Sequence, residues 1–161
     1  MTGQSTTTVA PIRKQVTVEA PQQRAFDVFT RRMGAWWNPY HRLGDQPLAD
    51  VVIEPREGGR WYEVDTDGTE CDWGRVLAWE PHDRVLLAWQ LNGDWDYDAD
   101  FVTELEIRFV AEGPTSTRVE LEHRDLDRFG ADVAAVRTSL DSPNGWSGLL
   151  ERFGGGLASE A

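Results

Sequence analysis

The sequence predicts an α+β fold in which a seven-stranded, curved antiparallel sheet grips a long carboxy-terminal helix. Three observations predict it: an alternating apolar–polar segment near the start, six more strand-like segments in the middle, and a helical apolar stripe at the end. A chain of 161 residues has the size of one domain. We therefore expect a disordered tail over residues 1–11, a single domain over residues 12–158 and a short tail over residues 159–161.

The domain is predicted to begin with a strand over residues 12–20, followed by Pro21, which suits the first turn of a helix. An apolar stripe at helical spacing comes next, formed by Phe26, Phe29, Met33 and Trp37. Gly34 lies inside this stripe and Pro39 ends it, so we expect two short helices with a break between them. The stripe places Trp37 in the core and predicts that its neighbour Trp36 points elsewhere.

Six short segments then favour strands, because they are rich in β-branched and aromatic residues. They cover residues 48–55, 58–65, 69–80, 84–91, 101–112 and 117–126. The turns between them carry Gly, Pro, Asn and Asp, which predicts an antiparallel meander. In the fifth segment Leu105, Ile107 and Phe109 share one face. In the sixth, His123 alternates in phase with Leu121, so we expect its ring to point inward.

Residues 129–141 predict a short helix or a turn-rich connection. A longer apolar stripe follows, formed by Trp146, Leu149, Leu150, Phe153 and Leu157. Ser142 is the expected N-cap of this last helix, with Pro143 at its first position, and Gly154 to Gly156 weaken its final turns. Because a twisted sheet of seven strands curls away from a straight helix, we expect a gap between them that suits a ligand.

Four stretches, in this order along residues 13–158, resemble a known family: "RAFDVFT…WWNP", "GGRWYE…DGTECDWGRVLAWEPHDRVLLAWQ", "TRVELEHRDLDRFG" and "DSPNGWSGLLERF". They are similar to the START-like (SRPBCC) superfamily, and most to its branch named after the activator of heat-shock protein ninety ATPase. The resemblance implies the helix-grip fold. It does not select a function, because relatives include lipid and hormone carriers, polyketide cyclases and co-chaperone modules.

The net charge of −12 excludes several partners. So acidic a surface repels the phosphates of nucleic acid and the headgroups of anionic membranes, and no apolar run is long enough to insert into a bilayer. The lone Cys71 rules out an internal disulfide, and the first residues do not form a secretory signal. We expect a cytoplasmic protein that binds a small hydrophobic ligand and uses no cofactor, with a homodimer as an open alternative.

Eight Trp residues are more than a core of this size needs, and they suggest an apolar cavity with polar groups at its edge. The residues expected to bind the ligand are Trp36, Tyr40, Trp61, Glu63, Cys71, Trp73, Trp89, Trp95, Tyr97, His123, Trp146 and Leu150. Which face of each middle strand lines the cavity stays open at this stage.

Among these residues His123 is the candidate general base, although a buried His more often only forms structural hydrogen bonds. His41 and His82 have no metal-ligand spacing, so we expect no metal site. Residues 94–105 match a calcium loop only at its first three acidic positions, and we expect an acidic hairpin tip there instead.

Three functions are compatible with these features. The first is non-catalytic binding of a small hydrophobic or aromatic molecule, and the second is a cyclase or dehydratase that uses the same cavity. The third is a co-chaperone-like interaction module, which the resemblance alone suggests. The larger co-chaperones carry an additional amino-terminal domain for which these 161 residues leave no room, so the third ranks last.

Overall fold

The computed structural model describes residues 9–159 and shows the expected α+β fold. The expected tails fall largely outside the described residues. The elements in chain order are β1 (Ile12–Val18), α1 (Gln22–Arg31), α2 (Met33–Trp36), β2 (Leu48–Ile53), β3 (Arg60–Asp65), β4 (Glu70–Glu80), β5 (Arg84–Trp89), β6 (Thr103–Gly113), β7 (Ser116–Arg124), η1 (Leu126–Asp132), α3 (Val133–Leu140) and α4 (Trp146–Ser159).

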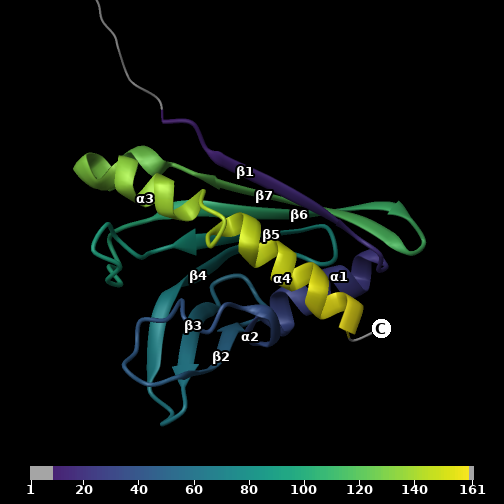
Figure 1. Cartoon of the computed structure of the whole chain (residues 1–161), viewed down its shortest axis with the longest axis horizontal. Coiled ribbons are helices and arrows are strands. Elements are labelled where there is room, and N and C mark those ends of the chain that lie inside the picture. The colour runs from purple at the N-terminus through teal and green to yellow at the C-terminus, as the bar shows by residue number, and fades with distance from the viewer. Residues whose placement is uncertain (1–8, 160–161) are drawn as a thin grey trace, which may run out of the picture.

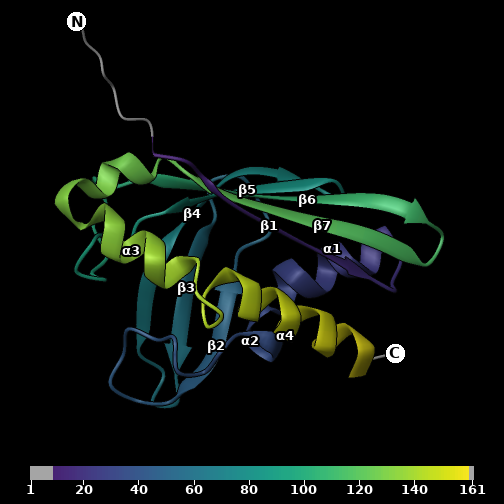
Figure 2. The same cartoon turned by 45° about the horizontal axis from the view of Figure 1, so that its top comes forward.

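The sheet has seven strands in the order β1-β7-β6-β5-β4-β3-β2, and every neighbouring pair is antiparallel. The expected meander is therefore confirmed, with β1 added beside β7. Figures 1 and 2 show that β2 and β3 bend away from β1, β7 and β6, so the sheet is strongly curled. Helix α4 crosses the hollow side of this sheet, and α1 and α2 lie beside it.

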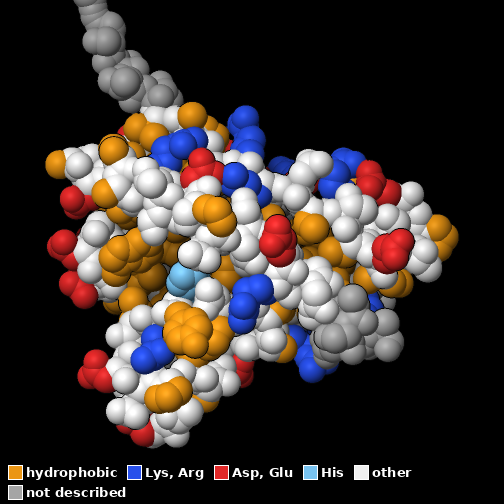
Figure 3. All heavy atoms as spheres, in the orientation of Figure 1, with side chains coloured by type: hydrophobic (Ala, Val, Ile, Leu, Met, Phe, Trp, Pro, Cys, Tyr) orange, Lys and Arg blue, Asp and Glu red, His pale blue; other side chains and the backbone are white. Residues whose placement is uncertain are grey.

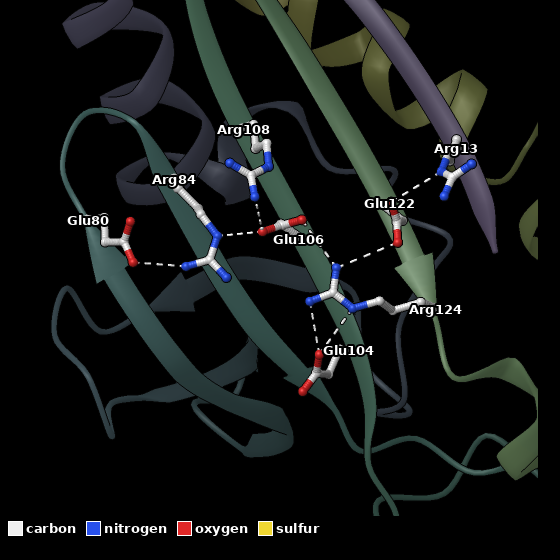
Figure 4. A network of polar contacts seen from close by, with 8 residues as sticks. All are labelled: Arg13, Glu80, Arg84, Glu104, Glu106, Arg108, Glu122 and Arg124. Atoms are coloured by element: carbon white, nitrogen blue, oxygen red, sulfur yellow. Dashed lines mark hydrogen bonds and ion pairs between the residues drawn. The ribbon is translucent and has the colours of Figure 1, made fainter.

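The two faces of the long strands differ as expected. Leu105, Ile107 and Phe109 are buried on the inner face, and His123 points inward with no exposed surface. The outer face carries a network of ion pairs that crosses five strands (Figure 4). Glu106 lies at its centre and contacts three arginines, Arg84, Arg108 and Arg124. Desolvation favours the protonated form of Glu106, but hydrogen bonds from Arg84 and Arg124 outweigh it and lower the pKa of this carboxyl.

The break between the first two helices is confirmed, and it corrects the expectation for Trp36. Arg32 leaves the helical conformation with φ −127° and ψ 32°, which shifts the register of the apolar stripe. Trp36 therefore turns into the core, where its ring lies 5.0 Å from that of Phe29 and 5.5 Å from that of Phe153. Its indole N–H donates to the carbonyl of Val28 at 3.2 Å. The backbone of Trp37 is extended, and its buried indole leaves the helical stripe.

The start of the last helix also differs from the expectation. Helix α4 begins at Trp146, and Leu149 donates its backbone N–H to Gly145 at 3.0 Å. Ser142 is therefore not the N-cap. Its hydroxyl donates to the carbonyl of Ser139 at 2.7 Å, which holds the connection between α3 and α4.

The backbones of β4 and β5 approach each other closely at Gly74. A Cβ added there would overlap the carbonyl oxygen of Ala88 on β5. We expect Gly74→Ala to lower the free energy of unfolding by about 3 kcal/mol, the upper end of the usual range for overpacking. Gly155→Ala is the control, because a Cβ at that helical position meets no atom within 4 Å. It should leave stability unchanged or raise it slightly. Urea denaturation of both variants checks this, and equal stabilities would contradict it.

Candidate functional site

A cavity of about 300 Å³ opens between the sheet, the segment 37–43 and the connection between α3 and α4. Five of the residues that line it are tryptophans: Trp37, Trp73, Trp89, Trp95 and Trp146. Leu43, Leu91, Leu140 and Leu149 add aliphatic surface. Polar groups come from Tyr40, His41, Arg42, Ser139, Ser142 and Asn144. Figure 3 shows hydrophobic side chains exposed in a hollow below α3. The volume lies at the lower end of the range for small-molecule sites, about 300–1,000 Å³.

The indoles of the wall form one connected aromatic array. Trp37 packs on Trp73 with 5.0 Å between ring centroids, and Trp89 packs on Trp146 at 5.7 Å. Trp61 is fully buried behind the wall, in contact with both Trp73 and Trp89. Because these rings pack on one another, they form a continuous aromatic surface along the cavity.

Glu63 of β3 holds two parts of this wall together. Its carboxylate is fully buried and accepts three N–H groups. Trp73 donates its indole N–H to Oε1 at 2.8 Å, and the backbone N–H of Leu43 donates to the same oxygen at 2.6 Å. The backbone N–H of Gly44 donates to Oε2 at 3.1 Å. Glu63 therefore fixes both the orientation of an indole and the position of the loop over residues 38–47.

His123 of β7 lies behind another indole. The indole N–H of Trp146 donates to Nδ1 of His123 at 3.2 Å, so Nδ1 accepts and the ring proton lies on Nε2. Nε2 then donates to the hydroxyl oxygen of Thr103 at 2.8 Å. Complete burial disfavours the charged ring and lowers the pKa of His123 to about 3. His123 thus remains neutral near pH 7 and orients Trp146.

The loop after β5 brings Trp95 to the cavity. The side-chain oxygen of Asn92 accepts the backbone N–H groups of Asp94 and Asp96 at 2.9 and 3.1 Å. This turn holds Trp95 at φ 63°, and its ring lies 6.3 Å from that of Trp89. Trp95 lines the cavity, whereas Tyr97 of the same loop is exposed and does not.

Five of the residues expected at the site line the cavity: Tyr40, Trp73, Trp89, Trp95 and Trp146. Seven do not: Trp36, Trp61, Glu63, Cys71, Tyr97, His123 and Leu150. Four of these, Trp36, Trp61, Glu63 and His123, directly contact a lining indole. For Cys71, burial is the largest cause that raises the pKa of the thiol, and the negative charges of Glu63 and nearby Asp residues raise it further. The thiol is therefore a poor nucleophile.

Sequence reasoning missed the contributions of two connecting segments. His41, Arg42 and Leu43 come from the loop after α2, and Ser142, Asn144 and Gly145 from the connection before α4. The available signal was their position next to the aromatic residues Tyr40 and Trp146. Their polarity makes them resemble ordinary surface loops, and only the fold brings both segments to one cavity.

Comparisons with known proteins give a consistent picture. The family model for activator of Hsp90 ATPase homolog 1-like proteins matches residues 19–155. A solved structure of Txn09, an anthrahydroquino-γ-pyrone synthase complexed with SUM, is similar over 92% of this chain and 97% of that chain, with 40% identity and a TM-score of 0.66. CalC from Micromonospora echinospora, a self-sacrificing resistance protein, is similar over 94% and 96% of the two chains, with 33% identity and a TM-score of 0.71.

CalU16 from the same organism is 21% identical, over 93% of this chain and 77% of that chain with a TM-score of 0.58, and supports the fold alone. A comparison with curated proteins gives no match. None of the helices within residues 9–159 is long and apolar enough to cross a membrane.

Proposed function

Because the chain belongs to the family of activator of Hsp90 ATPase homolog 1-like proteins, whose model matches most of its length, we propose a function for the cavity that this fold contains. The protein binds a flat, polycyclic aromatic molecule between the curled sheet and the connection before α4. The convergence of five indoles on one cavity carries this proposal. Aromatic rings pack favourably against one another. Because the indoles are already held in place, little conformational entropy is lost when the ligand binds.

The comparison with Txn09 supports the chemical class of the ligand. That protein is named as an anthrahydroquino-γ-pyrone synthase, and 40% identity over nearly the whole chain makes a related ligand the natural candidate here. The wall is mainly apolar, and its polar groups come from the two connecting segments and from Ser139 at the end of α3. Such a site suits fused rings that carry a few oxygen substituents.

Trp95→Ala tests the proposal with a matched control on the same loop. We expect calorimetric titration of the wild type with 2-methoxyanthraquinone to show saturable binding. Loss of the Trp95 ring face should weaken it about tenfold, which corresponds to about 1.4 kcal/mol. Tyr97→Ala removes an aromatic side chain of similar exposure, 42% against 39%, that does not line the cavity. The affinity of Tyr97→Ala should stay within twofold of the wild-type value. No binding to the wild type, or equal losses in both variants, would contradict the proposal.

An enzyme of the cyclase type is the second candidate. It is favoured by one observation, the presence of an imidazole and a guanidinium in consecutive residues of an otherwise mainly apolar wall.

A further inference from the structure

His41 and Arg42 form the polar corner of the cavity. Of the described residues that line it, Arg42 alone is a cation, and none is a carboxylate. We propose that the cavity takes its aromatic ligand as an oxyanion, with Arg42 as counter-ion and His41 as the group that accepts the hydroxyl proton. This rests on the proposed function and specifies its ligand as a hydroxylated aromatic, a phenol or an enol.

The hydrogen bonds of His41 fix which ring nitrogen is available. Nε2 lies 2.7 Å from the carbonyl oxygen of Asn144, which can only accept, so Nε2 carries a proton. The side-chain nitrogen of Asn38 is 3.5 Å from Nε2, too far to compete. In the neutral ring Nδ1 therefore carries the lone pair, and no described residue donates a hydrogen bond to it. A base held by a backbone carbonyl through its other nitrogen has the geometry that general-base catalysis uses.

Arg42 is available to an anion. Within residues 9–159 no carboxylate forms an ion pair with it, and its one hydrogen bond runs from Nε to the carbonyl of Gly44 at 3.3 Å. This is notable in a chain with 28 acidic and 16 basic residues, where many other arginines form ion pairs. A planar guanidinium beside aromatic rings both stacks and pairs with an oxyanion.

The other charged or titratable groups around this corner do not replace Arg42 as counter-ion. Tyr40 lines the wall and is mostly exposed. Asp45, which follows on the same loop, is acidic and so cannot serve as counter-ion to an oxyanion. Glu63 lies behind the loop, and its two oxygens are occupied by the N–H groups of Trp73, Leu43 and Gly44. The exposed aspartates on the loop of Trp95 do not line the cavity, and as anions they cannot pair with an oxyanion.

The proposed step balances without a co-reactant. The O–H bond of the ligand breaks, its proton forms an N–H bond at Nδ1 of His41, and the electron pair remains on oxygen as a phenolate or enolate. The imidazolium and the oxyanion together carry no added charge, and the guanidinium stabilises the oxyanion. Such an anion is the nucleophile that a ring closure through oxygen requires.

The test compares 2-hydroxyanthraquinone, whose ionisation changes its visible absorption, with 2-methoxyanthraquinone, which has no acidic proton. On the wild type we expect the apparent pKa of the bound phenol to fall by at least one unit relative to the free ligand. Arg42→Met should abolish most of this shift and weaken binding of 2-hydroxyanthraquinone about tenfold at pH 8. Its affinity for 2-methoxyanthraquinone should stay within twofold of the wild-type value. Arg42→Lys should retain most of the shift, and Arg56→Met, which changes an arginine outside the cavity, should retain all of it.

The number of protons released on ligand binding tests the role of His41 separately from that of Arg42. Calorimetry about one unit below the pKa of the free phenol, in buffers of different ionisation enthalpy, should show that the wild type binds the phenol as its phenolate with little proton release, because His41 keeps the proton. His41→Asn should release about one proton to the buffer. If both ligands bind the wild type equally and the phenol is not shifted, this inference fails and the proposed function stands. If neither ligand binds, both fail.

Discussion

Acidification from pH 7 to pH 4.5 should destabilise the folded protein by about 3 kcal/mol through His123 alone. The pKa of this ring falls from 6.5 to about 3 on folding, because it is completely buried. Between these two values the unfolded ring binds a proton that the folded ring does not. The free energy of unfolding therefore decreases by about 1.4 kcal/mol for each unit that the pH falls below 6.5.

The sign follows from the neutral state of the buried ring. Its contribution is fully present above pH 6.5 and fully lost below about pH 3. Both ring nitrogens are already in use, since Nδ1 accepts from Trp146 and Nε2 donates to Thr103. Protonation at Nδ1 would place a second donor against the indole N–H. The acid-induced loss should therefore begin at the wall indole Trp146 and weaken ligand binding as well as stability.

His123→Gln isolates this effect from other acid-sensitive groups. The carboxyls of Glu106 and Asp141 also have lowered pKa values, so the wild type loses stability in acid for more than one reason. Urea denaturation at several pH values between 6.5 and 4.5 should give a slope for the variant that is smaller by about one proton. Equal slopes would contradict the prediction. A ring of His123 that titrates above pH 5 by NMR would contradict it independently.

The fold could be predicted because its determinants are local. Strict alternation in β6 and β7 assigns each residue to a face, and the structure places Leu105 and His123 inside as that alternation requires. Helix breaks and caps depend on single residues and are less secure. The departure of Arg32 from helical geometry moves Trp36 into the core, and Ser142 serves the preceding connection rather than α4.

The site could be predicted only in its aromatic half. A surplus of indoles indicates a cavity, and four of the predicted Trp residues line it. His41 and Arg42 lie in a loop with no hydrophobic periodicity, so nothing local assigns them a direction. Their place depends on a long-range interaction, the buried carboxylate of Glu63, which accepts two amides of that loop.

Replacement of Glu63 is expected to have the other large effect. In Glu63→Leu three N–H donors lose their acceptor together, the buried indole of Trp73 and the partly buried amides of Leu43 and Gly44. Each unsatisfied donor costs about 1–3 kcal/mol, so we expect a loss of about 4 kcal/mol after the loop opens and exposes its two amides to water. Glu63→Gln keeps one acceptor oxygen for two of the donors and should lose about half as much.

The loop should detach before the sheet unfolds, because only the loop amides can reach water. Hydrogen exchange at Leu43 and Gly44 should therefore accelerate far more in Glu63→Leu than exchange in β6, and affinity for 2-methoxyanthraquinone should fall at least tenfold. Glu70→Leu is the control, since Glu70 lies on the neighbouring strand in a half-exposed ion pair with Arg60. Surface pairs of this kind contribute about 0–1 kcal/mol. If Glu63→Leu kept the protection of both loop amides, Glu63 would not anchor this wall, and the position of His41 and Arg42 would need another cause.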